Sequence, residues 1–294
     1  MLEIQDLCKN FGSKIVLNQV NITIEEGTVF GLVGINGAGK STLLRCISGV
    51  YYPDGGAIRF NGEDTYYNEE VRKDIFFVSD DAYFPSNSTI KSMRTFYESF
   101  YDLDEIAYQK YLKLFKLNEN AQTSSFSKGM KRQSILLFAL AIRPKLLLLD
   151  ECFDGLDPLV RLTFKKALVD LLEDNSITVI ISSHNLKELE DICDSFGILE
   201  NGQINTYGDL LESKENITKY QLAFHEAKGK EDFSEFDLMS YKKEGKVYTL
   251  VIKGNKEEVE KRLEAYEPIL LNELPVNFEE LFIYEVESRG MLNE

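Results

Sequence analysis

A glycine-rich run that ends in a lysine and two hydroxyl residues carries the clearest chemical signal in this sequence. Residues 34–42 read Gly-Ile-Asn-Gly-Ala-Gly-Lys-Ser-Thr and fit the phosphate-binding pattern G-x-x-x-x-G-K-[ST]. Main-chain amides of such a loop point at phosphate oxygens, and glycines let the backbone approach without a Cβ in the way. The residues predicted to line the phosphates are Asn36, Gly37, Ala38, Gly39, Lys40, Ser41 and Thr42. Lys40 is expected to reach the β- and γ-phosphates, and the Ser41 hydroxyl is expected to hold Mg²⁺.

An acidic pair after the apolar run 146–149 supplies a second chemical signal. Asp150 and Glu151 come at the carboxyl end of a predicted buried strand, which is where α/β sheets bind ligands. Asp150 suits a contact to Mg²⁺, and Glu151 is placed to orient and deprotonate an attacking water. Taken alone, the pair could instead cap the following helix, because acidic residues are common at helix starts. The phosphate loop upstream favours the first interpretation, which is hydrolysis of a nucleoside triphosphate.

The elements around both signals alternate between strands and helices. Residues 28–33 form a short apolar run that predicts a buried strand, and Leu43, Leu44 and Ile47 share one helix face after the loop. Further buried strands are expected at 75–78, 146–149 and 177–181, and helices at 134–142, 158–172 and 186–193. This alternation predicts an α/β fold with a mostly parallel sheet and helices on its faces. The phosphate loop between a strand and a helix makes this fold resemble the core of a P-loop NTPase.

The remaining segments predict smaller units around that core. Residues 2–24 and 57–60 read as strands of an antiparallel subdomain, and Asn201-Gly202 is a hairpin signal. A helical subdomain is expected at about 83–140, where aromatic residues fall at helical spacing and are interpreted as core. The composition becomes charged near 212–215, so we place a domain boundary at 212/213. A small α+β accessory domain over 213–294 is then expected, with strands at 220–224, 247–252 and 269–271 and helices at 256–266 and from Asn277.

Composition limits the classes of function that this chain can have. It has 294 residues, 44% of them hydrophobic, which is enough for a sizeable core. The net charge of −16 disfavours a nucleic-acid binder and direct docking on anionic lipid. We expect no membrane-spanning segment and no signal peptide, because no apolar stretch approaches about 20 residues. The four cysteines are scattered without metal-ligand spacing, and we expect buried thiols in a reducing cytosol: Cys8, Cys46, Cys152 and Cys193.

In their order along the chain, these motifs resemble the nucleotide-binding subunit of an ATP-binding cassette (ABC) transporter over about residues 1–212. The family's signature segment usually reads Leu-Ser-Gly-Gly-Gln, and residues 126–130 here read Phe-Ser-Lys-Gly-Met. Ser127 and Gly129 match that signature. The resemblance implies that Ser127 caps the next helix and that Ser127 and Gly129 bind the γ-phosphate of an ATP held by a second subunit. It therefore implies a head-to-tail homo- or heterodimer with two ATP molecules between the subunits.

Three further positions match residues with known roles in the family. Phe11 stands where an aromatic ring stacks on adenine, although a packing role at a strand end is the alternative. His184 matches the switch histidine that contacts the γ-phosphate. Asp157 matches the aspartate that crosses the dimer interface, and it can also begin the helix that has Pro158 in its first turn. With Glu151 and His184 both present, we expect a hydrolytically competent site.

Two departures from the family pattern affect these expectations. The family's glutamine after the strand 75–78, which binds Mg²⁺ and couples to the membrane subunit, is Asp80 in this chain. A carboxylate can still ligate Mg²⁺, so the expected metal ligands are Ser41, Asp80 and Asp150. Cys152 replaces the proline that usually follows the glutamate, which should soften that turn, and we assign it no catalytic role.

The resemblance also implies partners and a place in the cell. The helical subdomain corresponds to the part that grips a transmembrane permease encoded as a separate chain, with its Phe and Tyr residues supplying an apolar groove. The Ser-Lys-Gly-Met form and the short C-terminal domain resemble a bacterial exporter subgroup that handles peptides, antibiotics or other amphiphiles. ATP and Mg²⁺ are the implied cofactors, and the cytoplasmic face of the cell membrane is the implied location. The alternative is a soluble ABC-type ATPase that acts on ribosomes or DNA, although the chain has one cassette, no long coiled coil and an acidic charge.

Overall fold

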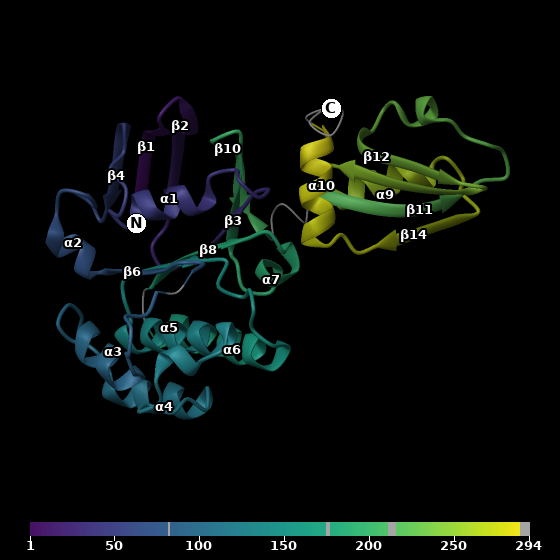
Figure 1. The fold of residues 1–294 in the computed structure, drawn as a ribbon. Helices are drawn as coiled ribbons and strands as arrows, with labels where there is room; N and C mark the ends of the chain where they lie inside the picture. Colours follow the sequence, from purple (N-terminus) through teal and green to yellow (C-terminus); the bar gives the residue numbers. More distant parts are fainter. Residues whose placement is uncertain (82, 175–176, 211–215, 289–294) are drawn as a thin grey trace. The chain divides into compact units, whose positions relative to one another are not determined.

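The computed structural model describes residues 1–294 except 82, 175–176, 211–215 and 289–294 (Figure 1). The chain divides into two compact units, Met1–Tyr207 and Gly208–Glu294. The expected boundary at 212/213 falls in a segment outside the described residues, and the structural division comes five residues earlier. No helix in the described part of the chain combines the length and the apolar character needed to cross a bilayer.

A six-stranded sheet forms the centre of the first unit. Its strand order is β10-β9-β3-β8-β7-β6, and the pairs from β9 to β6 are parallel. The strands are β3 (Val29–Val33), β6 (Ile75–Val78), β7 (Leu146–Asp150), β8 (Thr178–Ser183), β9 (Ser195–Glu200) and β10 (Gln203–Asp209). Every residue of β3, β7 and β8 is buried, as expected for parallel strands that are covered on both faces. The predicted parallel core and the predicted hairpin at Asn201-Gly202 are confirmed.

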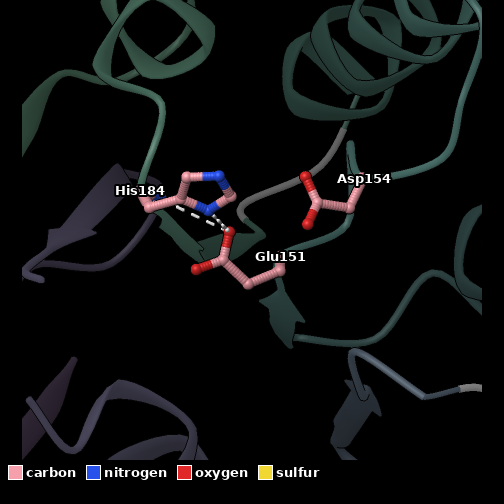
Figure 2. A group of neighbouring side chains, drawn as sticks. All are labelled: Glu151, Asp154 and His184. Carbon is pink, nitrogen blue, oxygen red and sulfur yellow. Dashed lines mark hydrogen bonds and ion pairs between the residues drawn. The ribbon is translucent and has the colours of Figure 1, made fainter. Parts of the chain in front are cut away.

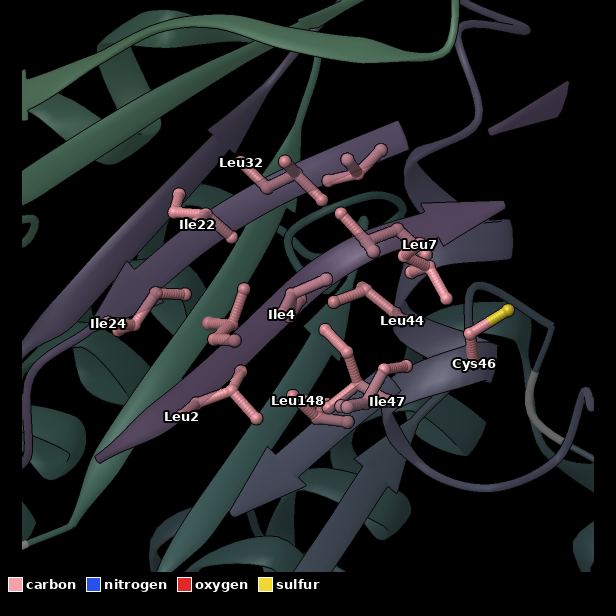
Figure 3. Packing of buried hydrophobic residues seen from close by; sticks show 14 of the residues in the cluster. Leu2, Ile4, Leu7, Ile22, Ile24, Leu32, Leu44, Cys46, Ile47 and Leu148 are labelled. Carbon is pink, nitrogen blue, oxygen red and sulfur yellow. The ribbon is translucent and has the colours of Figure 1, made fainter. Parts of the chain in front are cut away.

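An antiparallel sheet packs over the helix that follows the phosphate loop. Its order is β2-β1-β4-β5, from β1 (Leu2–Phe11), β2 (Lys14–Ile24), β4 (Gly55–Phe60) and β5 (Glu63–Asp64). Helix α1 (Lys40–Ile47) lies between the two sheets. Figure 3 shows Leu44 and Ile47 of α1 among Ile4 and Leu7 of β1 and Leu148 of β7, in one buried cluster. Burial of this apolar face fixes α1, and with it the phosphate loop, to both sheets.

The helical subdomain is built around one buried helix. α3 (Ile90–Tyr97) and α4 (Glu105–Leu114) pack against α5 (Lys128–Ile142), and α6 (Pro158–Asp174) lies beside α5. The first unit also contains the short helices α2 (Glu69–Lys73) and α7 (Leu186–Glu190). α5 begins six residues before the predicted start at 134, because its first turns are polar, and α7 ends three residues before the predicted end.

The interpretation of the aromatic residues as core is only half correct. Tyr108 and Tyr111 of α4 are buried, and Phe138 of α5 is fully buried against Tyr108. Phe96 and Phe100, by contrast, are 54% and 58% exposed. α3 ends at Tyr97, so Phe100 lies beyond the helix and does not continue its buried face.

The described residues of the second unit include a four-stranded antiparallel sheet and the helices α9 and α10. Its order is β12-β13-β11-β14, and all of its described pairs are antiparallel. The elements are β11 (Ile217–Ala223), β12 (Asp237–Glu244), β13 (Val247–Lys253), α9 (Lys256–Glu264), β14 (Leu270–Leu274) and α10 (Phe278–Ser288). The expected α+β character is correct, but β12 was not predicted. It is an edge strand whose last residues, Lys242, Lys243 and Glu244, are exposed and charged, so it carries little apolar signal.

Candidate active site

The phosphate loop joins β3 to α1 in the conformation that its glycines permit. Gly37 and Gly39 have φ angles of 85° and 110°, which L side chains rarely adopt. A Cβ on Gly34 would come within 2.5 Å of the Leu199 carbonyl oxygen, so glycine is required there for packing. A Cβ on Gly37 would meet no atom within 4 Å, so the backbone at Gly37 is open to approach. Gly39 precedes α1 without a side-chain cap, which leaves the first amides of the helix facing the loop.

Lys40 is buried at the start of α1 and its ammonium reaches two parts of the site. Only 6% of its surface is exposed. Nζ donates a hydrogen bond to the Gly34 carbonyl oxygen at 2.6 Å and lies 3.5 Å from Glu151 Oε1. The positive charge of Lys40 therefore lies between the backbone of the phosphate loop and the carboxylate of Glu151. An ammonium in this position sits beside the open backbone of the loop, where a phosphate group would enter.

Asp150 ends β7 as a fully buried carboxylate with one unmatched oxygen. Oδ1 accepts a hydrogen bond from Ser182 Oγ at 2.6 Å, whereas Oδ2 has no partner among the described residues. Burial raises the pKa of Asp150, and the hydroxyls of Ser182 and Ser41 offset that effect in part. An unmatched buried carboxylate oxygen beside a serine hydroxyl is a donor set that suits a hard divalent cation. The predicted ligands Asp150 and Ser41 thus fit Mg²⁺, and the third, Asp80, is near enough for its charge to act on Asp150.

Glu151 turns back into the site because its backbone is left-handed. Its φ is 46°, an unusual value for a residue other than glycine, and its amide donates to the Ser182 carbonyl oxygen and to Ser182 Oγ, both at 3.1 Å. The carboxylate lies between Lys40 and His184: Oε2 is 2.9 Å from His184 Nδ1 and also accepts from the His184 amide at 3.3 Å. A carboxylate held by a lysine and a histidine beside the phosphate loop has the geometry of a general base.

Asp154 joins this group from the turn that follows Glu151 (Figure 2). One ligand atom from each of Glu151, Asp154 and His184 lies within 4.8 Å of the others. No role was predicted for Asp154 from the sequence. The signal that could have found it is its position three residues after Glu151, directly before Gly155. In the structure Gly155 has a φ of 74°, and the chain turns there.

Asp80 is held by an ion pair and its loop by a buried arginine. Asp80 Oδ1 lies 3.4 Å from Arg45 Nη2 of α1. Arg132 of α5 donates to the carbonyl oxygens of Ser79, at 2.6 Å, and Asp80. Neither arginine was predicted to belong to the site, because no residue near Arg45 or Arg132 in the sequence indicates a contact with residues 79–80.

Ser127 and Asp157 act as helix caps in this chain. Ser127 Oγ accepts from the Met130 amide at 3.2 Å at the start of α5, as predicted. Asp157 Oδ1 accepts from the amides of Leu159 and Val160 at 3.0 Å, so it caps α6. A Cβ on Gly129 would lie 2.9 Å from the Gly155 carbonyl oxygen, so these two segments pack tightly.

The structure brings some of the predicted residues together and leaves others apart. Lys40, Ser41, Asp150, Glu151 and His184 form one connected group. Within the described residues, no hydrogen bond or ion pair joins Ser127, Gly129, Asp157 or Phe11 to that group.

Phe11 lies at the end of β1 and 46% of its surface is exposed. Its ring packs edge-on against Tyr51, with centroids 5.4 Å apart. Lys9 Nζ lies 5.4 Å from the same ring centroid. These contacts leave both earlier interpretations, adenine stacking and strand-end packing, in place.

Comparisons with known proteins agree on one family. The family model described as "ABC transporter" matches residues 17–154. The ABC transporter ATP-binding protein YtrB of Bacillus subtilis is 32% identical over 96% of this chain and 97% of its own length. A solved structure described as the ATP-binding subunit of an ABC transporter has a TM-score of 0.67 at 30% identity, covering 73% of this chain and 92% of its own.

Relatives whose names state different cargoes match about equally well. The lantibiotic transport ATP-binding protein SrtF of Streptococcus pyogenes is 31% identical over 69% of this chain and 89% of its own length. A probable sulfate/thiosulfate import ATP-binding protein, CysA of Chlorella vulgaris, is 33% identical over 73% of this chain and 94% of its own. The match to YtrB, at 96% of this chain, extends over parts of both units.

Proposed function

This chain belongs to the ATP-binding subunits of the ABC transporter family, which are ATPases, and we propose that it powers an exporter. The proposed cargo is a peptide, an antibiotic or another amphiphile, and the cargo touches the permease rather than this subunit. The observation that carries the hydrolytic part of the proposal is the Glu151 carboxylate, held between Lys40 and His184 beside buried Asp150. The name of SrtF, a lantibiotic transport protein, supports a peptide cargo, whereas the name of CysA states import of sulfate or thiosulfate.

The proposed chemistry assigns one task to each side chain of the site. Lys40 and the loop amides hold the β- and γ-phosphates, which replace the present contact of the ammonium with Gly34. Ser41, Asp150 and Asp80 hold Mg²⁺, which when bound neutralises phosphate charge and orients the phosphoryl oxygens. Glu151 accepts a proton from the attacking water, and the Ser182 hydrogen bonds keep its backbone in place. His184 orients that carboxylate and reaches toward the γ-phosphate.

A second subunit completes each site in this proposal. Ser127 and Gly129 contribute to the ATP of the opposite subunit, and Asp157 faces it across the interface. Ser127 and Asp157 are both exposed, although their side-chain oxygens also cap helices. A capping hydroxyl or carboxylate keeps lone pairs for a further contact. Phosphate release that rises more steeply than protein concentration at high dilution would support dimer-dependent turnover, and strict proportionality would refute it.

A permease partner is proposed from the exposed apolar residues of the helical subdomain. Phe96, Phe100 and Ile106 are 54%, 58% and 83% exposed, which is unusual for large apolar side chains so close together in sequence. Covering them with a cytoplasmic helix of a permease would place this chain at the inner face of the cell membrane.

The experiment that tests partner and direction uses native membranes. The tagged chain is isolated in mild detergent, its co-purifying integral protein is identified, and the pair is placed in vesicles with the cassette outside. Accumulation of an amphiphilic peptide inside the vesicles on addition of ATP supports export. ATP-driven loss of preloaded cargo would indicate import. Stimulation of the ATPase by ribosomes or DNA, with no membrane partner, would favour the soluble alternative.

A further inference from the structure

Arg132 is a buried charge held by backbone oxygens rather than by a carboxylate. Only 2% of its surface is exposed. Nη1 donates to the Ser79 carbonyl oxygen at 2.6 Å and Nη2 donates to that of Asp80. Within the described part of the chain, no acidic side chain forms an ion pair with it. A buried guanidinium is costly unless it is hydrogen-bonded, so these two contacts account for its position.

The segment that Arg132 holds is fixed from two sides. The Asp80 side chain pairs with Arg45 of α1, which begins at the phosphate loop. The Ser79 and Asp80 backbone is bound by Arg132 of α5, which begins at Ser127. The loop 79–81 is therefore a link between the helix that carries Lys40 and the helix that carries the signature residues.

The position of this loop determines where the Asp80 carboxylate lies. β6 and β7 are parallel neighbours, with Val78 paired to Leu149, so Asp80 and Asp150 leave adjacent strand ends. Arg132 fixes the two peptide units at Ser79 and Asp80, immediately after that strand end. A shift of those peptide units would move the carboxylate relative to Asp150 and Ser41.

We propose that Arg132 is a positioning residue, which holds the Ser79–Asp80 backbone so that the Asp80 carboxylate stays at the metal end of the site. The inference rests on the proposed function, because it gives Asp80 a place among the metal ligands. Arg132 itself touches neither nucleotide nor metal in this proposal. It acts through two carbonyl oxygens, and its effect therefore depends on the side chain at position 80.

The test compares Arg132→Gln and Arg132→Lys with Lys131→Gln, a neighbouring charge change on the same helix. Mn²⁺ is the probe metal, because it takes the same oxygen ligands as Mg²⁺. Its dissociation constant is measured by electron paramagnetic resonance with a non-hydrolysable ATP analogue present. Turnover, the KM for ATP at saturating metal and the urea midpoint in EDTA are measured on the same proteins.

For Arg132→Gln we expect Mn²⁺ affinity and kcat to fall roughly tenfold, with the KM for ATP within about twofold, because two charge-assisted hydrogen bonds are lost. Arg132→Lys should show a smaller loss, since an ammonium can still bind one carbonyl oxygen. Lys131→Gln should match the wild type. In an Asp80→Asn background the effect of Arg132→Gln on Mn²⁺ affinity should largely disappear.

A lower urea midpoint in both arginine variants with unchanged Mn²⁺ affinity would overturn the inference, because the arginine would then be structural only. If Arg132→Gln does not fold, the test rests on Arg132→Lys. A Mn²⁺ affinity equal to that of the wild type in Arg132→Lys would then overturn the inference. If Arg132→Gln lowers Mn²⁺ affinity as much in the Asp80→Asn background as in the wild type, Arg132 does not act through the Asp80 carboxylate and the inference is overturned. A wild-type chain that neither binds the Mn²⁺–analogue complex nor hydrolyses ATP would refute the proposed function instead.

Discussion

Asp150→Asn should make the nucleotide-free protein more stable while it abolishes turnover. The Asp150 carboxylate is fully buried, one of its oxygens has no partner among the described residues, and burial raises its pKa. An unmatched buried polar group costs about 1–3 kcal/mol, and a charged one costs more. The amide keeps the shape and can still accept the hydrogen bond from Ser182. We therefore expect a gain of about 1–2 kcal/mol, which corresponds to a rise of about 2–8 °C in Tm for a unit of this size.

The measurement is thermal and urea unfolding in EDTA, with and without a Mg²⁺–nucleotide analogue complex. Without ligand the variant should be the more stable protein. With ligand at about 100 times its Kd the wild type should gain about 2.7 kcal/mol, whereas the variant should gain less because it lacks a metal ligand, so that the order reverses. Asp74→Asn is the matched control, since this half-exposed carboxylate pairs with Lys145 at the surface and its loss should change stability by less than about 0.5 kcal/mol.

The difference in stability between the wild type and Asp150→Asn should depend on pH, because burial raises the pKa of Asp150. The folded pKa of Asp150 lies above its unfolded value, so the folded state binds this proton more tightly. Stability from this group is therefore greatest below the unfolded pKa and is lost as pH rises through the folded pKa. The gain in unfolding free energy of Asp150→Asn over the wild type should be largest at neutral pH and should become smaller as the pH falls. A variant that is less stable than wild type in EDTA at neutral pH would refute the reasoning.

Three further substitutions test the other parts of the site. Glu151→Gln should bind ATP, lose turnover on the order of 100-fold or more and form a stable dimer with ATP on gel filtration; rapid turnover would refute its role as base. Lys40→Ala should weaken nucleotide binding about 10- to 100-fold by calorimetry, and unchanged binding would contradict the phosphate cradle. Asp80→Gln should tighten Mg·ATP binding or change the stimulation of turnover by the permease, and no change in either would place Asp80 outside the site.

The parts of the site that the sequence predicts are those whose chemistry is local. The phosphate loop is contiguous, and its glycines at 37 and 39 have the positive φ angles that the pattern requires. Ser127 and Asp157 were predicted to begin helices, and each accepts hydrogen bonds from amides two or three residues ahead. Such contacts depend on neighbours along the chain, so residue types and spacing suffice to find them.

The parts that the sequence does not predict join residues far apart in the chain. Ser182 contacts Asp150, Lys40 approaches Glu151, and Arg132 binds the backbone at Asp80, and in each pair the partners come from different elements. Their meeting depends on the order of the strands, because β7 lies between β6 and β8 in the sheet. The apolar runs in the sequence identify these strands but do not give their order in the sheet. The polar contacts at the strand ends therefore cannot be predicted before the fold is known.

The net charge of the chain says little about the charge at the site. The whole sequence carries −16, which by itself opposes binding of a polyanion. At the site, four carboxylates lie near three basic side chains: Asp80, Asp150, Glu151 and Asp154 with Lys40, Arg45 and Arg132. The ion pair at Asp80 explains how an aspartate can stand where the family has a neutral glutamine, since Arg45 supplies the compensating charge. It follows that Arg45→Met should weaken nucleotide binding in this chain but should do so less in an Asp80→Gln background, because the carboxylate that it offsets is then absent.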